Sequence, residues 1–170
     1  MSPRTKKVFL FMVVVVPFIL YCVYYYGMMI KNAPYRFVDF QSLNFQYGHK
    51  DSLVNKYDSH TGMFQYLDKR DSLISEHLHF TKDDLLYLHR KAADLGFWDF
   101  PSNEIGDTTA AAKGKAVRYI IEFKYKEKTK RVIFDSDYFG NPKLIDANQR
   151  LIAEIQQRIT AVEARGKSKK

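Results

Sequence analysis

Two pairs of side chains have the residue types and spacing that could bind a metal ion or transfer protons. His77 and His79 lie two residues apart in an alternating segment, so both imidazoles would share one face of a strand. Glu76 on the opposite face and His89 on the next helix are the nearest additional ligands. A structural zinc site needs four ligands and a catalytic one needs three. Because no nearby cysteine or well-spaced glutamate completes the set, we favour a solvated strand face.

Asp135 and Asp137 form the second pair, at the end of a strand-like run. They would project from the same side, as paired carboxylates do where they bind a cation or act as acid and base. Loop aspartates more often accept hydrogen bonds from local backbone amides, and we favour that role. The sequence has no phosphate-binding glycine loop, no Gly-x-Ser-x-Gly elbow and no His-Glu-x-x-His motif. We therefore expect no enzymatic site, no cofactor and no resident metal.

The most prominent element is an uncharged run from Val8 to Ile30, with Arg4, Lys6 and Lys7 before it and Lys31 after it. At about 1.5 Å per residue, this run is long enough to cross a hydrocarbon core of about 30 Å. The sequence therefore predicts a transmembrane helix over residues 8–30, after a basic tail over residues 1–7.

Two other interpretations of this run remain open. A cleaved signal peptide has an apolar stretch of about 7 to 15 residues and small residues before the cleavage site. Here the run is longer and ends in Tyr24–Ile30, which lacks such a small-residue site. A lipoprotein would be modified at Cys22, but the bulky Tyr21 precedes this cysteine and apolar sequence follows it. We favour a retained anchor whose tyrosines lie at the headgroup boundary.

The basic residues on the two sides of the run are nearly balanced, since Lys31 and Arg36 follow it closely. A short basic tail before a long carboxyl-terminal domain favours tail inside and domain outside. We expect a single-pass protein of a bacterial inner membrane with its domain in the periplasm, and a eukaryotic secretory membrane is the alternative. The only cysteine lies within the run, so the exported domain would have no disulfide.

The formal net charge of +8 does not indicate a nucleic-acid-binding protein. Residues 1–30 and 166–170 each contain three lysines or arginines and no acidic residue. The sequence between these segments is nearly balanced in charge. A nucleic-acid binder is expected to have a basic stripe on its folded part, and this pattern is missing.

The first half of the remaining sequence predicts a juxtamembrane spacer over residues 31–51 that contains one strand-like piece, and then an α+β domain over residues 52–165. Asx and glycine residues at 58–62 predict a hairpin turn. Thr81 and Asp84 have capping-box spacing at the start of a helix that runs to about Leu95, where Gly96 stops it. Alternation predicts strands at 43–47, 53–57, 63–67 and 72–80.

The second half has no regular period from Ser102 to Lys115, which we expect to be a mobile loop. Residues 117–126 and 130–134 predict a second hairpin with a charged turn. A long amphipathic helix would start near Pro142 or Asp146. It would end at about residue 165, before a disordered basic tail over residues 166–170.

This order of strands, helix, strands and helix predicts an α+β fold. We expect an antiparallel sheet of about four to six strands with two helices packed on one face.

Three features together resemble small bacterial envelope proteins built around a domain of unknown function. They are the exit Phe97-Trp98, the charged hairpin, and the pattern Tyr138-x-Gly140-x-Pro142-x-Leu144. The domain in such proteins often follows a membrane or lipoprotein signal. The resemblance covers about residues 47–159, although the cysteine-containing first hairpin frequent in these proteins is absent. It implies an envelope location and an α+β layout, and it identifies no catalytic residue.

Two functions of different classes follow. The first is a single-pass membrane-anchored, non-catalytic domain of the cell envelope with an interaction or accessory role. Its partners would be the membrane and an envelope protein bound through an exposed apolar patch or a sheet edge. The second is an anchored hydrolase or metal-binding protein that uses Asp135/Asp137 or His77/His79. It requires one of these pairs to converge with further polar groups in one cleft. We favour the first.

Overall fold

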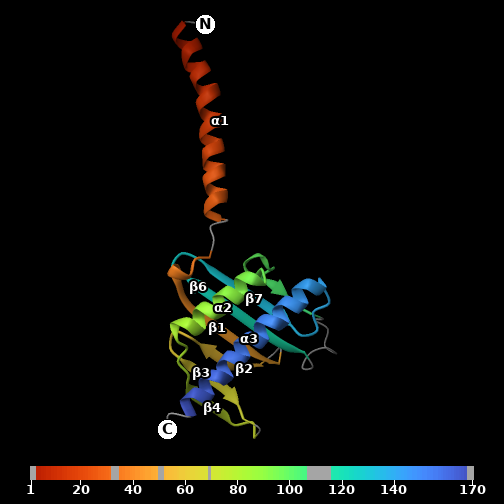
Figure 1. The fold of residues 1–170 in the computed structure, drawn as a ribbon. Helices are drawn as coiled ribbons and strands as arrows, with labels where there is room; N and C mark the ends of the chain where they lie inside the picture. The colour runs from red at the N-terminus through yellow and green to blue at the C-terminus, as the bar shows by residue number, and fades with distance from the viewer. Residues whose placement is uncertain (1–2, 32–34, 50–51, 69, 107–115, 168–170) are drawn as a thin grey trace. The chain divides into compact units, whose positions relative to one another are not determined.

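The computed structural model describes residues 3–31, 35–49, 52–68, 70–106 and 116–167 of the 170-residue chain. The chain divides into two compact units, Met1–Tyr35 and Arg36–Lys170. The first unit contains helix α1 (Pro3–Lys31), and the second contains a sheet and the remaining helices (Figure 1).

Helix α1 is long and apolar enough to cross a membrane, and the decisive stretch is Phe9–Tyr26. None of this stretch is buried. A helix whose surface is made of exposed Phe, Val and Leu side chains is stable in lipid, where its backbone groups bond internally. An amino-terminal signal sequence meets the same criteria of length and composition. The helix begins at Pro3, so most of the predicted basic tail over residues 1–7 belongs to α1.

The second unit contains one seven-stranded sheet with the order β4-β3-β2-β1-β6-β7-β5. Neighbouring strands are antiparallel except β5 and β7, which are parallel. The predicted α+β class is confirmed, and the sheet has one strand more than the upper end of the predicted range. The strands are β1 (Phe40–His49), β2 (Ser52–Asp58), β3 (Met63–Leu67), β4 (Leu73–His77), β5 (Asn103–Glu104), β6 (Val117–Tyr125) and β7 (Thr129–Asp135).

Strand β1 corrects the prediction of a spacer over residues 31–51. It lies in the middle of the sheet, where Phe45 is opposite Tyr57 of β2 and Ile121 of β6. Its apolar side chains Leu43 and Phe45 are buried in the core, and its backbone pairs with β2 on one side and, from much later in the chain, with β6 on the other. The folded unit therefore begins at Arg36, where the 3₁₀ helix η1 (Phe37–Asp39) soon follows, and not at residue 52.

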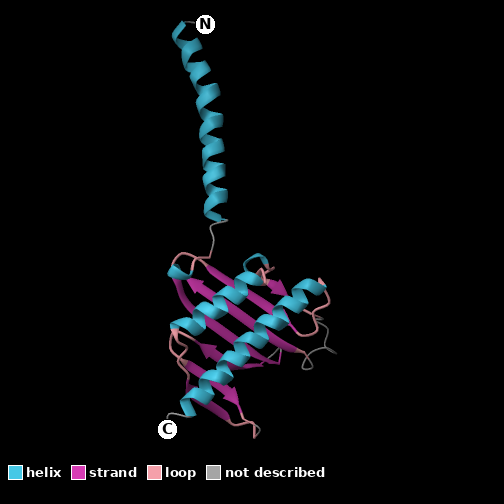
Figure 2. Ribbon diagram, viewed as in Figure 1, coloured by secondary structure: helices cyan, strands magenta, loops and turns pink. Residues whose placement is uncertain are grey.

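Helices α2 (Lys82–Asp94) and α3 (Pro142–Lys167) both lie across the same face of the sheet, as Figures 1 and 2 show. The core lies between these helices and the sheet. Burying such apolar side chains contributes about 1.5 to 3 kcal/mol each. The fully buried side chains of this core include Phe45, Phe123 and Val132 from the sheet, Leu88 and Ala92 from α2, and Leu151 and Ile155 from α3.

The start of α2 confirms the predicted capping box. The Asp84 backbone N–H donates to Thr81 Oγ1 at 3.2 Å, and the Thr81 N–H donates to Asp84 Oδ2 at 3.0 Å. After the helix, Gly96 adopts the left-handed conformation with φ of 75°, which a glycine reaches without strain. The 3₁₀ helix η2 (Phe97–Asp99) follows and packs Trp98 against Phe123.

Two predicted boundaries differ in the structure. Helix α3 continues to Lys167, so the tail predicted over residues 166–170 begins inside the helix, and residues 168–170 lie outside the described residues. The loop predicted over Ser102–Lys115 contains β5 and an ordered Gly106. The rest of that loop, 107–115, lies outside the described residues.

Candidate functional site

The two predicted histidines come together at one end of the domain. His77 and His79 are exposed and line a hollow of about 360 Å³ with Thr81, Val162 and Arg165. Glu76 points to the helix-covered face, where Tyr66 donates its hydroxyl to Glu76 Oε1 at 3.2 Å.

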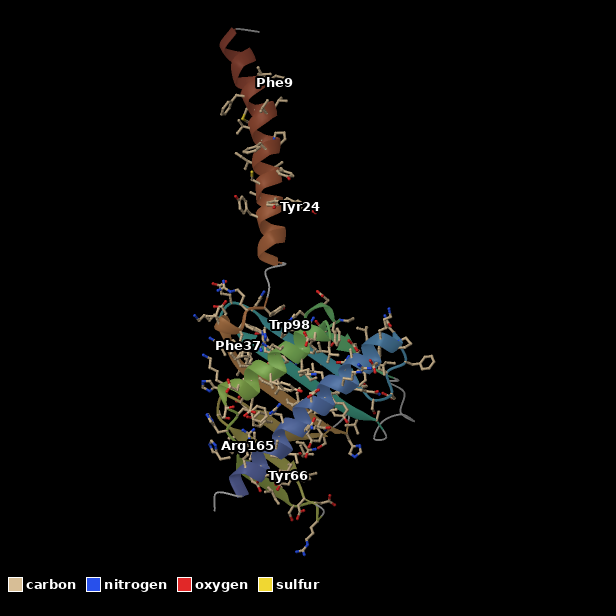
Figure 3. All side chains as sticks on the ribbon, viewed as in Figure 1. Phe9, Tyr24, Phe37, Tyr66, Trp98 and Arg165 are labelled. Carbon is tan, nitrogen blue, oxygen red and sulfur yellow. The ribbon has the colours of Figure 1, made fainter. Side chains whose placement is uncertain are left out.

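His89 is not near this hollow. It is buried between Phe37 and Trp98, with ring centroids 5.4 and 5.3 Å away. Figure 3 shows these two labelled aromatics at the far side of the domain from Arg165 and Tyr66. Across the residues that the structure describes, no three His, Cys, Asp or Glu side chains form a group that could hold a metal ion.

The arginine in the hollow is held by a buried carboxylate. Arg165 Nη2 contacts both oxygens of Asp84 at 3.0 and 3.1 Å, and Arg158 Nη1 contacts Oδ1 at 3.2 Å. Burial opposes ionisation of Asp84, but the hydrogen bonds from Arg165 and Thr81 outweigh it and hold the pKa below its ordinary value. These contacts tie the end of α3 to the start of α2.

The two predicted aspartates also come together, around Gly106. Asp135 is fully buried, and it receives hydrogen bonds from Arg118 at 2.7 and 3.0 Å and from the Gly106 N–H at 3.2 Å. Asp137 lies against the same glycine, where a Cβ would collide with its carboxylate. Arg118 neutralises the charge of the Asp135 carboxylate. Through these hydrogen bonds, the carboxylate links β6, β7 and the segment after β5.

Sequence reasoning missed a buried polar pair beneath α3. Glu104 of β5 and Asn148 of α3 both have 0% exposure, and Asn148 Nδ2 donates to Glu104 Oε2 at 2.7 Å. Burial raises the pKa of Glu104 to about 7, although Lys130 and the Asn148 hydrogen bond lower it in part. No local pattern marks Glu104, because its burial comes from the parallel pairing of β5 with β7.

The sheet face opposite the helices is polar over its middle strands. A hollow of about 530 Å³ there is lined by polar and charged side chains. Asn44 of β1 donates to Glu122 of β6 at 3.2 Å on this face. The residues lining the hollow are Gln41, Ser42, Asn44, Asp58, His60 and Lys124.

The same face becomes apolar at the β3–β4 end. Met63, Leu67 and Leu73 are 44%, 38% and 56% exposed, and Leu67 is directly opposite Leu73. Since Met63 is opposite His77, all these side chains lie on the uncovered face. We call Met63, Leu67 and Leu73 the apolar edge patch.

The outer edge of β4 carries backbone groups that point away from the sheet. The Gly62–Leu78 and Asp68–Ser72 pairs are joined by hydrogen bonds at the two ends of the β3–β4 ladder. Hydrogen-bonded pairs alternate along an antiparallel ladder. The backbone N–H and C=O groups of Leu73, Ser75 and His77 therefore point away from β3. Among the described strands, none pairs with β4 on that side.

Comparison of the chain with protein-family models and with curated proteins finds no match.

Proposed function

We propose that the protein is a single-pass, membrane-anchored interaction domain of the cell envelope. Helix α1 is the retained anchor, and the outer edge of β4 binds an extended segment of an envelope protein. The observation that carries this proposal is the outward direction of the backbone groups of Leu73, Ser75 and His77 beside the apolar edge patch.

An added strand would satisfy the edge in a defined way. Three outward residues offer three donors and three acceptors, and a partner strand would bond to them as in β-augmentation. On the uncovered face, the partner residue opposite Leu73 would pack beside this leucine, and the next ones on that face would lie beside Ser75 and His77. The matching partner is therefore an extended segment with an apolar residue opposite Leu73.

The β4 edge also lacks the usual protection against pairing. Proteins blunt exposed edges with proline, lysine, bulges or very short strands. Strand β4 has the sequence Leu-Ile-Ser-Glu-His and a regular register with β3, whereas β5 at the opposite edge is only two residues long. An unprotected edge with exposed leucine is expected where pairing is the function.

The alternative function, an anchored hydrolase or metal-binding protein, lacks a comparable observation. Asp135 is saturated by Arg118 and Gly106, and the hollow beside His77 and His79 includes no further carboxylate.

The anchor and its orientation can be tested in one topology assay. A reporter active only outside the cytoplasm would be fused after Lys170, and the product would be tested for membrane extraction and size. We expect an active reporter on an uncleaved, membrane-integral product. An inactive reporter would place the domain in the cytoplasm, and a shortened soluble product would contradict the retained anchor.

The edge can be tested by photo-crosslinking in intact membranes. A photoreactive residue at Leu73 should yield an adduct with a second protein, and the same residue at Arg131, which is exposed on β7, should not. An adduct at twice the mass of the chain would mean that β4 pairs with another copy. Equal adducts from both positions, or none from Leu73, would contradict a partner at this edge.

A further inference from the structure

The Glu104–Asn148 pair joins two elements that are far apart in the sequence. Glu104 lies opposite Phe134 of β7 and faces α3, which carries Asn148. Both side chains are fully buried, so neither can complete its hydrogen bonds with bulk water.

An ionised Glu104 leaves two buried oxygens without donors. The two N–H groups of the Asn148 amide are used, one on Glu104 Oε2 at 2.7 Å and one on Leu144 O at 2.9 Å. Glu104 Oε1 and Asn148 Oδ1 then have no hydrogen-bond partner in the described part of the chain. Each buried acceptor without a donor costs about 1 to 3 kcal/mol.

Reversing the Asn148 amide does not solve this problem. It would place the amide oxygen against Glu104 Oε2 and Leu144 O, which are both acceptors, and would lose both existing hydrogen bonds. A single proton on Glu104 Oε1 does solve it, because the resulting O–H donates to Asn148 Oδ1. The acid and the amide then form a closed pair with one hydrogen bond in each direction.

The charges around the pair do not compensate an ionised Glu104. Lys130 of β7 acts on it, but the Lys130 ammonium donates to the Phe100 carbonyl and also lies in the field of Asp99. Asp135 lies on the opposite face of β7 and pairs with Arg118. From α3, Asn148 bonds to Glu104 and to the Leu144 carbonyl, and neither of these α3 residues carries a charge.

We propose that Glu104 is protonated in the folded protein at mildly acidic pH, and that its O–H donates a hydrogen bond to Asn148 Oδ1. The pair is then a pH-sensitive latch between β5 and α3. Loss of the proton leaves a buried charge under α3, so the β5 segment loosens as the pH rises.

The raised pKa of Glu104 determines the sign of the effect. The folded state binds the proton more tightly than the unfolded chain, where the pKa is about 4.3. The contribution to stability is complete below the unfolded pKa and is lost as the pH rises through about 7. Between pH 5.5 and pH 8, the ratio of folded to unfolded protein should fall roughly thirtyfold from this group alone.

The test uses the full-length protein in detergent. Trp98 is the only tryptophan and packs against Phe97 and Phe123, so its fluorescence reports unfolding of the domain. The variant Glu104→Gln places an amide donor where we infer the proton, and Glu127→Gln on the exposed β6–β7 turn is the matched control. We expect Glu104→Gln to lose the fall in stability between pH 5.5 and pH 8 and Glu127→Gln to keep it. Parallel pH profiles for the wild type and Glu104→Gln would overturn the proposal.

Infrared spectroscopy of the wild-type protein measures the protonation of Glu104 directly and does not depend on how the variants fold. At pH 6 ordinary carboxyl groups are ionised, so a protonated carboxyl band should come from Glu104 and disappear with a midpoint near pH 7. Absence of this band at pH 6 would mean that Glu104 is ionised and that a bridging water satisfies the pair, which would overturn the proposal.

Discussion

Arg118 and Asp135 lie directly opposite each other across β6 and β7, and the Arg118 guanidinium contacts both carboxylate oxygens of Asp135 at 2.7 and 3.0 Å. The pair lies on the sheet face opposite Phe134, and Gly106 adds a third donor. This bidentate geometry is the strong form of the interaction between arginine and carboxylate. This geometry explains how Asp135, which the sequence suggests as a possible partner of Asp137 in an acid–base pair, contributes to the fold.

The Arg118–Asp135 pair predicts a large loss of stability when only the arginine is removed. Arg118→Gln removes the cation that faces the buried carboxylate, and we expect a loss of about 2 to 4 kcal/mol in denaturant unfolding followed by Trp98 fluorescence. The control Asp146→Asn breaks an exposed pair with Arg150 and should cost less than about 1 kcal/mol. Similar losses for both variants would show that the buried pair is not important for stability.

The outward direction of Ser75 predicts that proline is tolerated there and not at the next position. Ser75→Pro removes an N–H that points away from β3, so the domain should stay folded while the crosslink from Leu73 disappears. Ile74→Pro removes an N–H that points toward Tyr66 of β3, and it should lower the melting temperature strongly. If both variants unfold the domain equally, the assigned ladder is wrong.

The contact between α2 and α3 predicts a measurable coupling between Tyr87 and Glu154. The Tyr87 hydroxyl donates to Glu154 Oε2 at 2.8 Å, and the Arg158 guanidinium lies 4.4 Å from the centre of the Tyr87 ring. Tyr87→Phe should cost about 0.5 to 1.5 kcal/mol and keep the ring contact. A double-mutant cycle with Glu154→Gln checks the pair, because additive losses would mean that the hydrogen bond contributes nothing.

The lowered pKa of Asp84 predicts a loss of stability in acid, which is opposite in sign to the effect of Glu104. A depressed folded pKa contributes stability above the unfolded value, and this contribution is lost as the pH falls through the folded one. Arg165→Gln should therefore lower stability at pH 6 and reduce the further loss between pH 6 and pH 3. Arg150→Gln, at an exposed position of α3, should leave the acid profile of the wild type unchanged.

Local patterns determined much of the domain before any tertiary contact was known. Alternation in residues 53–57, 63–67 and 117–125 predicted β2, β3 and β6, because a half-buried strand must show its two faces in its own sequence. Thr81 and Asp84 predicted the start of α2 because both partners of the capping box lie within one helical turn. The apolar composition of residues 8–30 likewise predicted a helix suited to lipid.

Beyond the two predicted hairpins, only the tertiary structure decided which strands are neighbours. The central place of β1, the open edge of β4 and the pairing of β5 with β7 all depend on segments distant in the sequence. Two residues of strand are too few to show a period, so nothing in the sequence indicated that Glu104 is buried against Asn148. The sequence by itself thus determined most of the elements, including the long apolar helix. The buried ion pair, the open edge and the buried Glu104–Asn148 pair exist only because the sheet brings distant residues together.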